Sequence, residues 1–194
     1  MVYKNEVPVF ENRGVDPAAF LLSAYQHFEL NYPKFYKMDS LSKLGWLAAE
    51  VLLKNTNIKD YLPEDVGLIL ANANSSLDSD QKYIKSVSDV PSPALFVYTL
   101  PNIMIGEICI RNNFKGEDAF FIFENFDAGF TELYVNNLLS NNILETCICG
   151  WVDLLGDQYK AVLFLVEKIE RDHSIPFNKK NLDGIFDNLV IDKK

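Results

Sequence analysis

The sequence predicts a layered α/β fold in which helices cover a sheet with at least two parallel neighbouring strands. Two observations indicate this fold. Short apolar runs typical of buried strands recur along the chain, and segments with apolar residues at helical spacing lie between them. The last two strand-like runs are separated only by a short turn, as in a hairpin. With 194 residues, the chain can form one sizeable core.

The first third of the chain contains one clear helix. Val7–Phe10 is typical of a short strand, and residues 16–30 have a weak helical pattern. The clear helix spans about 40–54, and Asp39 or Ser40 can cap its first turn. Its apolar stripe consists of Leu41, Leu44, Ala48, Val51 and Leu52.

A buried strand and a second helix are predicted in the middle of the chain. Residues 66–71 are apolar at successive positions, as in a strand that is buried on both faces. The polar run 72–80 predicts a loop. Pro101 can occupy the first turn of a helix that continues to Ile110, and the segment 112–118 is predicted to turn.

A strand–helix unit follows. Residues 119–123 predict a second buried strand, and the segment 124–129 connects it to a helix over Ala128–Ser140. Asp127 is a suitable N-terminal cap for this helix, and the asparagine pair 141–142 suits a left-handed helix end. The side chains expected to pack on the sheet are Phe130, Leu133, Tyr134 and Leu138.

The C-terminal part predicts a hairpin followed by an extension. Residues 146–152 and 161–166 are typical of a third and a fourth strand, joined by a turn at 155–158. We therefore expect one domain over residues 1–170. The extension 171–194 is polar with scattered apolar residues, so it either docks as a peripheral helix or frays.

Composition and charge exclude several classes of partner. The net charge is −9 with only 18 Lys and Arg, so a global basic field for nucleic acid is absent and an anionic membrane repels the chain. No apolar run is long enough to cross a bilayer. Lys4 and Glu6 lie where a secretory signal has its apolar core. We expect a cytoplasmic protein that binds neither nucleic acid nor membrane.

The cysteines and histidines predict no metal site. Cys109, Cys147 and Cys149 all lie in apolar stretches, and the last two share one face of a strand, where they cannot form an ordinary disulfide. His27 and His173 are the only histidines, and there is no second cysteine pair for zinc. We expect buried, reduced thiols and no cofactor.

Several segments, in one order along the chain, carry a further pattern. They are 35–44, SPALF at 92–96, LPN at 100–102, GEI at 106–108, NFKG at 113–116, 119–153 ending in GWVD, and 161–167. Together they resemble the N-terminal half of β-ketoacyl-acyl-carrier-protein synthases. Their counterparts in that family are the entry to the first helix, an SP-x-x-F … L-x-N … G-x-I run, a G-x-x-G turn, the cysteine strand–helix–strand and an A-x-x-x-x-L-E strand.

The resemblance implies a thiolase-like fold. A full synthase contains two similar halves, each with a five-stranded sheet covered by helices, so a mixed, mostly parallel five-stranded sheet is expected here. The chain is most similar to the short N-terminal-domain relatives that accompany full synthases and are commonly labelled chain-length factors. That similarity implies a role in fatty-acid, polyketide or aryl-polyene-type biosynthesis.

The chain lacks the residues that carry the family's chemistry. The family needs a cysteine at a helix N-terminus, where the helix dipole favours its thiolate, and histidines from the second half. The position of that cysteine corresponds to Asn125 or Phe126 here, and neither is a nucleophile. His27 and His173 match no family histidine. The resemblance therefore implies a non-catalytic subunit.

Three interpretations of the segment from Glu124 to Asp127 remain. The amide of Asn125 can polarise a thioester carbonyl, as in chain-length factors that carry glutamine there. Alternatively, Asp127 caps the helix, Asn125 forms a turn and Phe126 fills a vacated acyl tunnel. As a third reading, Glu124 and Asp127 form an acid/base pair for hydrolysis.

The strand before this segment is unusually aromatic. Its candidate residues are Phe120, Phe121, Ile122 and Phe123, which either pack in the core or line an acyl channel or a dimer seam. In the family this strand pairs with its counterpart across a twofold axis. The expected partner is therefore a full-length ketosynthase or a second copy, with acyl carrier protein reached only indirectly. The alternative function is a minimal decarboxylase or thioesterase acting on malonyl or acyl thioesters.

Overall fold

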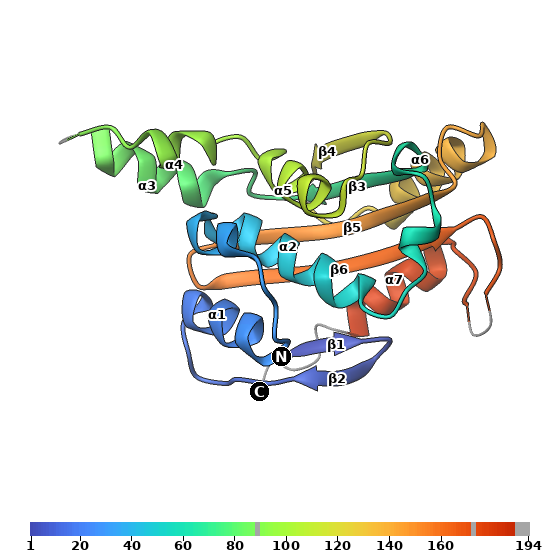
Figure 1. The fold of residues 1–194 in the computed structure, drawn as a ribbon, viewed down its shortest axis with the longest axis horizontal. Coiled ribbons are helices and arrows are strands. Elements are labelled where there is room, and N and C mark those ends of the chain that lie inside the picture. The colour runs from blue at the N-terminus through green and yellow to red at the C-terminus, as the bar shows by residue number, and fades with distance from the viewer. Residues whose placement is uncertain (88–89, 172–173, 189–194) are drawn as a thin grey trace.

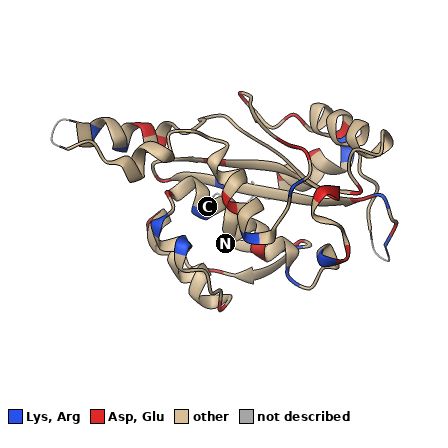
Figure 2. Ribbon diagram, turned by 45° about the horizontal axis from the view of Figure 1, so that its top comes forward, with Lys and Arg blue, Asp and Glu red and all other residues tan. Residues whose placement is uncertain are grey.

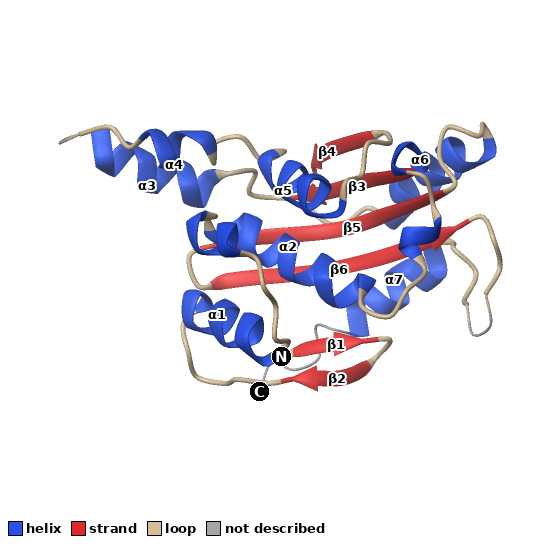
Figure 3. Cartoon of the chain, viewed as in Figure 1, coloured by secondary structure: helices blue, strands red, loops and turns tan. Residues whose placement is uncertain are grey.

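The computed structural model describes residues 1–87, 90–171 and 174–188. A four-stranded sheet carries helices on both faces, and a two-stranded hairpin lies beside it (Figures 1 and 3). The strands are β1 (Val2–Lys4), β2 (Val7–Phe10), β3 (Val66–Asn72), β4 (Asp118–Ile122), β5 (Thr146–Leu155) and β6 (Gln158–Glu167). The helices are α1 (Pro17–His27), α2 (Ser40–Leu53), α3 (Leu77–Val87), α4 (Pro93–Val97), α5 (Ile103–Asn112), α6 (Ala128–Ser140) and α7 (Lys179–Asn188). Short 3-10 helices occur at Pro33–Lys37, Ile58–Asp60 and Pro63–Asp65.

The central sheet has the strand order β4-β3-β5-β6. β3 runs parallel to both of its neighbours, and β6 returns antiparallel to β5 after a tight turn. Gly156 opens that turn with φ +58°, a conformation that glycine adopts without steric cost. The mixed, mostly parallel sheet that the sequence predicted is therefore confirmed.

The expected number of strands was wrong. The resemblance implied five, and the described residues form four in this sheet. The Val7–Phe10 strand is present, but among the described residues it pairs with β1 alone. Its Phe10 ring packs against Phe20 and Phe28 at centroid distances of 5.7 and 6.1 Å, so the hairpin is held by α1 and does not extend the sheet.

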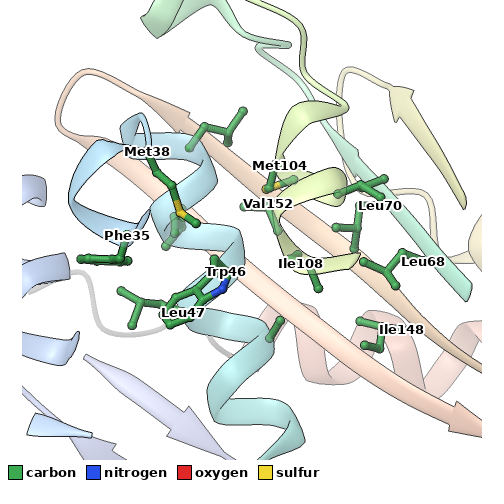
Figure 4. Packing of buried hydrophobic residues seen from close by; sticks show 14 of the residues in the cluster. Phe35, Met38, Trp46, Leu47, Leu68, Leu70, Met104, Ile108, Ile148 and Val152 are labelled. Atoms are coloured by element: carbon green, nitrogen blue, oxygen red, sulfur yellow. The ribbon is translucent and has the colours of Figure 1, made fainter. Parts of the chain in front are cut away.

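The two faces of the sheet bury two separate hydrophobic clusters, because successive side chains of a strand point to opposite sides. On one face, Leu68 and Ile148 meet a layer formed by α1, α2 and α5. Figure 4 shows Trp46 of α2 and Ile108 of α5 in this layer. On the other face, Ile69 and the two cysteines of β5 meet α6.

The sheet-facing side of α6 differs in part from the expected one. Leu138 is buried as predicted, but Leu133 is 72% exposed. The buried side chains of α6 are Ala128, Thr131, Val135, Leu138 and Leu139. Phe130 and Tyr134 contact the sheet as predicted, through β4, with their ring centroids 4.8 and 5.2 Å from that of Phe121. Of the four predicted contact residues, Leu133 is thus the one that stays exposed.

Leu133 and Leu138 of α6 differ in burial, so we predict different effects on stability when each is replaced by alanine. Replacing Leu138 with alanine should lower the free energy of unfolding by roughly 2–5 kcal/mol, because it removes buried methyl groups and leaves a cavity. Replacing the exposed Leu133 with alanine should change it by less than about 0.5 kcal/mol. Urea denaturation followed by circular dichroism measures both. Equal losses for the two variants would contradict the packing of α6.

Two helices that the sequence analysis did not identify project beyond one end of the sheet (Figure 1). α3 and α4 pack on each other, with Tyr83 and Phe96 at a ring-centroid distance of 5.4 Å. The polar run from residue 72 was predicted to be a loop through 80, but α3 begins at Leu77. The Ser79 hydroxyl donates to Asp39 at 2.6 Å, which ties the start of α3 to the N-terminal cap of α2.

The C-terminal extension forms a docked helix over its described part. α7 packs against α6, and the Lys179 amide donates to the Glu132 carboxylate at 2.7 Å. Leu182 is the one residue of α7 that is buried within the described range. His173 lies outside the described residues.

Charges of both signs are spread over the surface of the described elements, with Lys and Arg scattered among Asp and Glu (Figure 2). None of the helices within the described ranges combines the length and the apolar character that a bilayer crossing requires.

Candidate functional site at the end of β4

The predicted site is the loop that connects β4 to α6. Since β4 ends at Ile122 and α6 begins at Ala128, residues 123–127 lead from the sheet to the helix N-terminus. The Phe123 amide donates to the carbonyl of Asn72, at the end of β3, at 3.0 Å. The carboxyl ends of two parallel strands therefore meet here, at the edge where open α/β sheets usually bind their ligands.

Asn125 and Glu124 lie on the surface of this loop. Both side chains are exposed and make no hydrogen bond to another described residue. Asp127 accepts a hydrogen bond from the Phe130 amide at 2.8 Å and so caps α6, as predicted. A carboxylate in this position is stabilised by the partial positive charge of the helix N-terminus. Asp127 thus holds the helix start, while the Asn125 amide faces solvent.

Phe126 has the opposite orientation and enters an aromatic cluster. Its ring stacks on Phe186 of α7 with centroids 4.5 Å apart and planes at 21°. The centroids of Phe164 on β6 and Trp151 on β5 lie 6.2 and 6.4 Å away. We refer to Phe126, Trp151 and Phe164 as the aromatic floor. Phe126, which was predicted to fill a vacated acyl tunnel, is therefore part of a larger set of rings from four segments of the chain.

Phe186 is the member of this cluster that sequence reasoning missed. The signal that could have found it is the spacing of Leu182, Ile185, Phe186 and Leu189, at positions i, i+3, i+4 and i+7, which is typical of one apolar face of a helix. Lys160 of β6 strengthens the contact. Its Nζ lies 3.2 Å from the centroid of the Phe186 ring and donates to the Phe186 carbonyl at 2.8 Å.

The candidate channel or interface residues divide between the two faces of β4. Phe120 packs against the α2–α5 layer, whereas Phe121 and Phe123 stack with each other and contact Phe130 of α6. Ile122 is 55% exposed. Within the described residues no strand pairs with the outer edge of β4. This strand therefore combines a free backbone edge with an exposed apolar side chain at its end.

All three cysteines lie away from the loop. Cys147 and Cys149 are buried on β5 and share the face that α6 covers, as the spacing predicted. Burial raises the pKa of Cys147 to about 12 and that of Cys149 well above its ordinary value. Cys109, near the end of α5, is half-buried, and burial raises its pKa to about 12 as well. None of the three resembles an activated thiolate.

These surroundings predict slow modification of every thiol. A pKa of about 12 leaves a thiolate fraction at pH 8 that is roughly a thousandfold below that of a free cysteine. Iodoacetamide should therefore label the native protein at least about 100-fold more slowly than the protein in 8 M urea, which is the control. Rapid, stoichiometric labelling of any cysteine in the native chain would mean that the catalytic position has been assigned to the wrong loop.

The loop after β3 is fixed by a carboxylate of β5. Asp153 accepts hydrogen bonds from the amides of Ala73 and Asn74 at 3.2 and 3.0 Å, and from the Asn74 side chain at 2.7 Å. Asn72 and Ser75 exchange two further bonds of 2.9 Å within the loop. The loop that follows β3, which begins at the strand end bonded to Phe123, is therefore held in place by hydrogen bonds.

The helical layer on the other face contains a buried carboxylate, Glu107, in an ion pair with a partly exposed lysine that the sequence did not reveal. Glu107 of α5 lies 2.7 Å from Lys34 Nζ and accepts a hydrogen bond from the Tyr98 hydroxyl at 3.1 Å. Burial and then the charge of Glu107 raise the pKa of Tyr98 well above its ordinary value. Because these contacts join three segments of the chain, we assign them a structural role.

Two open hollows occur elsewhere on the described surface. One, of about 560 Å³, lies between the β1–β2 hairpin and the end of α2, and Lys4, His27 and Lys54 contribute to its lining. His27 is exposed and contacts the Val9 carbonyl at 3.2 Å. The other, of about 420 Å³, lies between α6 and β6. Neither is lined by residues 123–127.

Comparison with known proteins identifies the fold. No family model matches the sequence, and no curated protein is significantly similar to it. Among solved structures, the ishigamide ketosynthase/chain length factor superposes with a TM-score of 0.55 at 17% identity, over 67% of this chain and 38% of that chain. The AntDE:AntF complex, a type II PKS acyl-carrier protein in complex with its ketosynthase bound to the hexaketide, gives 0.57 at 19% identity, over 73% and 45%. A third similarity is to the ketosynthase ApeO in complex with its chain length factor ApeC from Xenorhabdus doucetiae, with a TM-score of 0.48, 13% identity, and coverage of 64% and 50%.

The chain thus spans less than half the length of the first two structures that it matches. Their superposition shows that it has the thiolase-like fold of ketosynthase and chain-length-factor proteins, as the sequence resemblance implied.

Proposed function

We propose that the chain is a non-catalytic, chain-length-factor-like subunit that pairs with a full-length ketosynthase and shapes the acyl channel of its partner. The main observation that supports this proposal is which residues occupy the loop before α6. An exposed amide, Asn125, and an inward phenylalanine, Phe126, stand at the helix N-terminus where the resemblance expects a nucleophilic cysteine. The partner then supplies the cysteine and the histidines.

An aromatic ring in this position supports a channel-limiting role. Phe126 cannot attack a thioester, but its ring and those of Trp151 and Phe164 offer a rigid apolar surface to a hydrocarbon chain. Such a surface favours acyl chains that are short enough to end against it. Longer acyl chains would have to insert methylene groups into a packed interior, which costs free energy.

The free edge of β4 supports pairing with another chain. An unpaired strand edge with exposed apolar groups is normally covered, either by another element or by a partner. The net charge of −9 affects how the assembly binds acyl carrier protein, because acyl carrier proteins are also acidic. On average this subunit repels them, so carrier docking falls to a more basic partner. We place the assembly in the cytoplasm.

Co-purification from the native host tests this proposal. An affinity-tagged chain should recover a ketosynthase in a stoichiometric complex, and the complex should lose its control of product length when Phe126 is replaced by alanine. Recovery of the chain without a ketosynthase, at native expression levels, argues against the subunit role.

A second candidate function rests on Asn125. Its amide is exposed next to the N-terminus of α6, where it and backbone N–H groups can polarise a thioester carbonyl. That arrangement supports a minimal decarboxylase or thioesterase. Turnover of malonyl or acyl thioesters by the purified chain, with loss of turnover on Asn125→Ala, would support it. Turnover that is unchanged in the variant assigns the activity to a contaminant.

A further inference from the structure

The aromatic floor is covered by a segment of the same chain. Phe186 of α7 stacks on Phe126, and the ring of Trp151 lies at a centroid distance of 6.3 Å. The Lys160 side chain also contacts Phe186, through its ring and its carbonyl. The surface of the aromatic floor on which a hydrocarbon chain could lie is therefore covered by Phe186 of the same chain.

The helix that provides this cover is intrinsically weak. It has ten residues, fewer than an isolated helix needs for stability in water. Half of its positions are poor helix formers, namely Asn181, Asp183, Gly184, Asp187 and Asn188. Its helical state therefore depends on docking, and docking and helix formation are lost together.

Gly184 has no packing function that would explain its place in the middle of this helix. A Cβ atom at this position would meet no atom of the described residues within 4 Å, and φ is not positive. Since glycine lowers helix stability relative to alanine, it weakens the cover without improving any contact.

The described part of α7 is held with little full burial. Within the described residues, Leu182 is its one buried side chain. Its polar ties to the rest of the chain include the Lys179 amide on Glu132 and the Lys160 ammonium on the Phe186 carbonyl. Loss of the second tie would leave Lys160 beside the floor with an open donor, suited to an anionic head group.

We propose that α7 is a lid over a hydrocarbon-binding surface formed by Phe126, Trp151 and Phe164, and that a linear chain with an anionic head displaces Phe186 to bind there. The lid rests on the proposed function, because it covers the same site. It adds that α7 controls access to this site. In the closed state the chain excludes hydrocarbon, and binding is coupled to the undocking of α7.

The matched pair Gly184→Ala and Gly106→Ala tests the coupling. Gly106 lies in α5, and a Cβ atom there also meets no atom within 4 Å, so both variants strengthen a helix without a new contact. With 11-(dansylamino)undecanoate as the probe, Gly184→Ala should weaken binding by about two- to fivefold, the factor by which alanine favours the closed helix. Gly106→Ala should leave the probe affinity unchanged.

Phe186→Ala should have the opposite effect. Loss of the stacked ring should open the lid and tighten probe binding by at least about tenfold, and hydrogen exchange at residues 179–188 should become faster while that of α6 stays unchanged. Exchange that slows in Gly184→Ala without any change in probe affinity would overturn the proposal, as would unchanged affinity in Phe186→Ala. These measurements use the purified chain alone. They can therefore support the lid even when no ketosynthase is recovered, and recovery of a ketosynthase does not by itself support the lid.

Discussion

Replacing Gly150 with alanine is expected to remove most of the stability of the protein. Gly150 lies within β5, between Leu70 of β3 and Leu163 of β6, and has φ +143°. A Cβ atom there would lie 2.1 Å from the backbone carbonyl oxygen of Val162. Backbone atoms of a paired strand cannot rotate away, so the clash adds to the conformational strain. We expect a loss of more than about 4 kcal/mol, against a typical total of about 5–15 kcal/mol.

Chemical denaturation of the two glycine variants Gly150→Ala and Gly106→Ala measures this effect. The helical position should gain up to about 1 kcal/mol, since alanine there meets only open space. A variant at 150 that unfolds at the same urea concentration as the wild type would mean that β5 and β6 are not in register as described.

A glutamate in place of Ile122 is expected to abolish association through β4. Because Ile122 is 55% exposed, the charge should change the stability of the monomer by less than about 0.5 kcal/mol. In an interface the same charge is desolvated without a partner. Its cost of 2 kcal/mol or more lowers affinity by at least about 30-fold. Multi-angle light scattering of the isolated chain, and co-purification with a ketosynthase, both measure the loss.

Lys115→Glu is the control for this prediction. Lys115 is exposed in the turn before β4 and forms only a loose ion pair with Glu64, at 3.8 Å, so its reversal should leave association unchanged. Equal effects of the two variants would indicate a general charge effect. A wild-type chain that stays monomeric at high concentration, with no partner recovered from the host, would remove the basis for the subunit proposal.

The sequence predicts most of the sheet because its strands are continuous apolar runs. All seven residues of β3 are buried, and such a run has no other stable place in a small protein. α3 was missed for the converse reason. Asp78, Asp80 and Lys82 make its first turns as polar as a loop, and only the contacts with α4 and Asp39 reveal the helix.

The candidate site was predicted in outline but not in depth. The cap by Asp127 follows from local chemistry, because an aspartate before a helix has few other roles. The contact between Phe126 and Phe186 joins residues sixty positions apart and depends on how α7 docks, which no local pattern encodes. Leu133 shows the same limit. Its spacing is helical, but the neighbouring aromatic residues, which pack around β4, decide which side of α6 faces the sheet.

The central position of β3 has a consequence for synthesis of the chain on the ribosome. β3 pairs with β4 on one side and with β5 on the other, so residues 66–71 find their second partner only at residues 146–151. Until that segment has emerged, an entirely apolar strand keeps one open edge. Pairing between segments so distant in sequence is also slow. The nascent chain therefore exposes an entirely apolar strand for much of its synthesis, and we expect it to bind chaperones that recognise extended apolar segments.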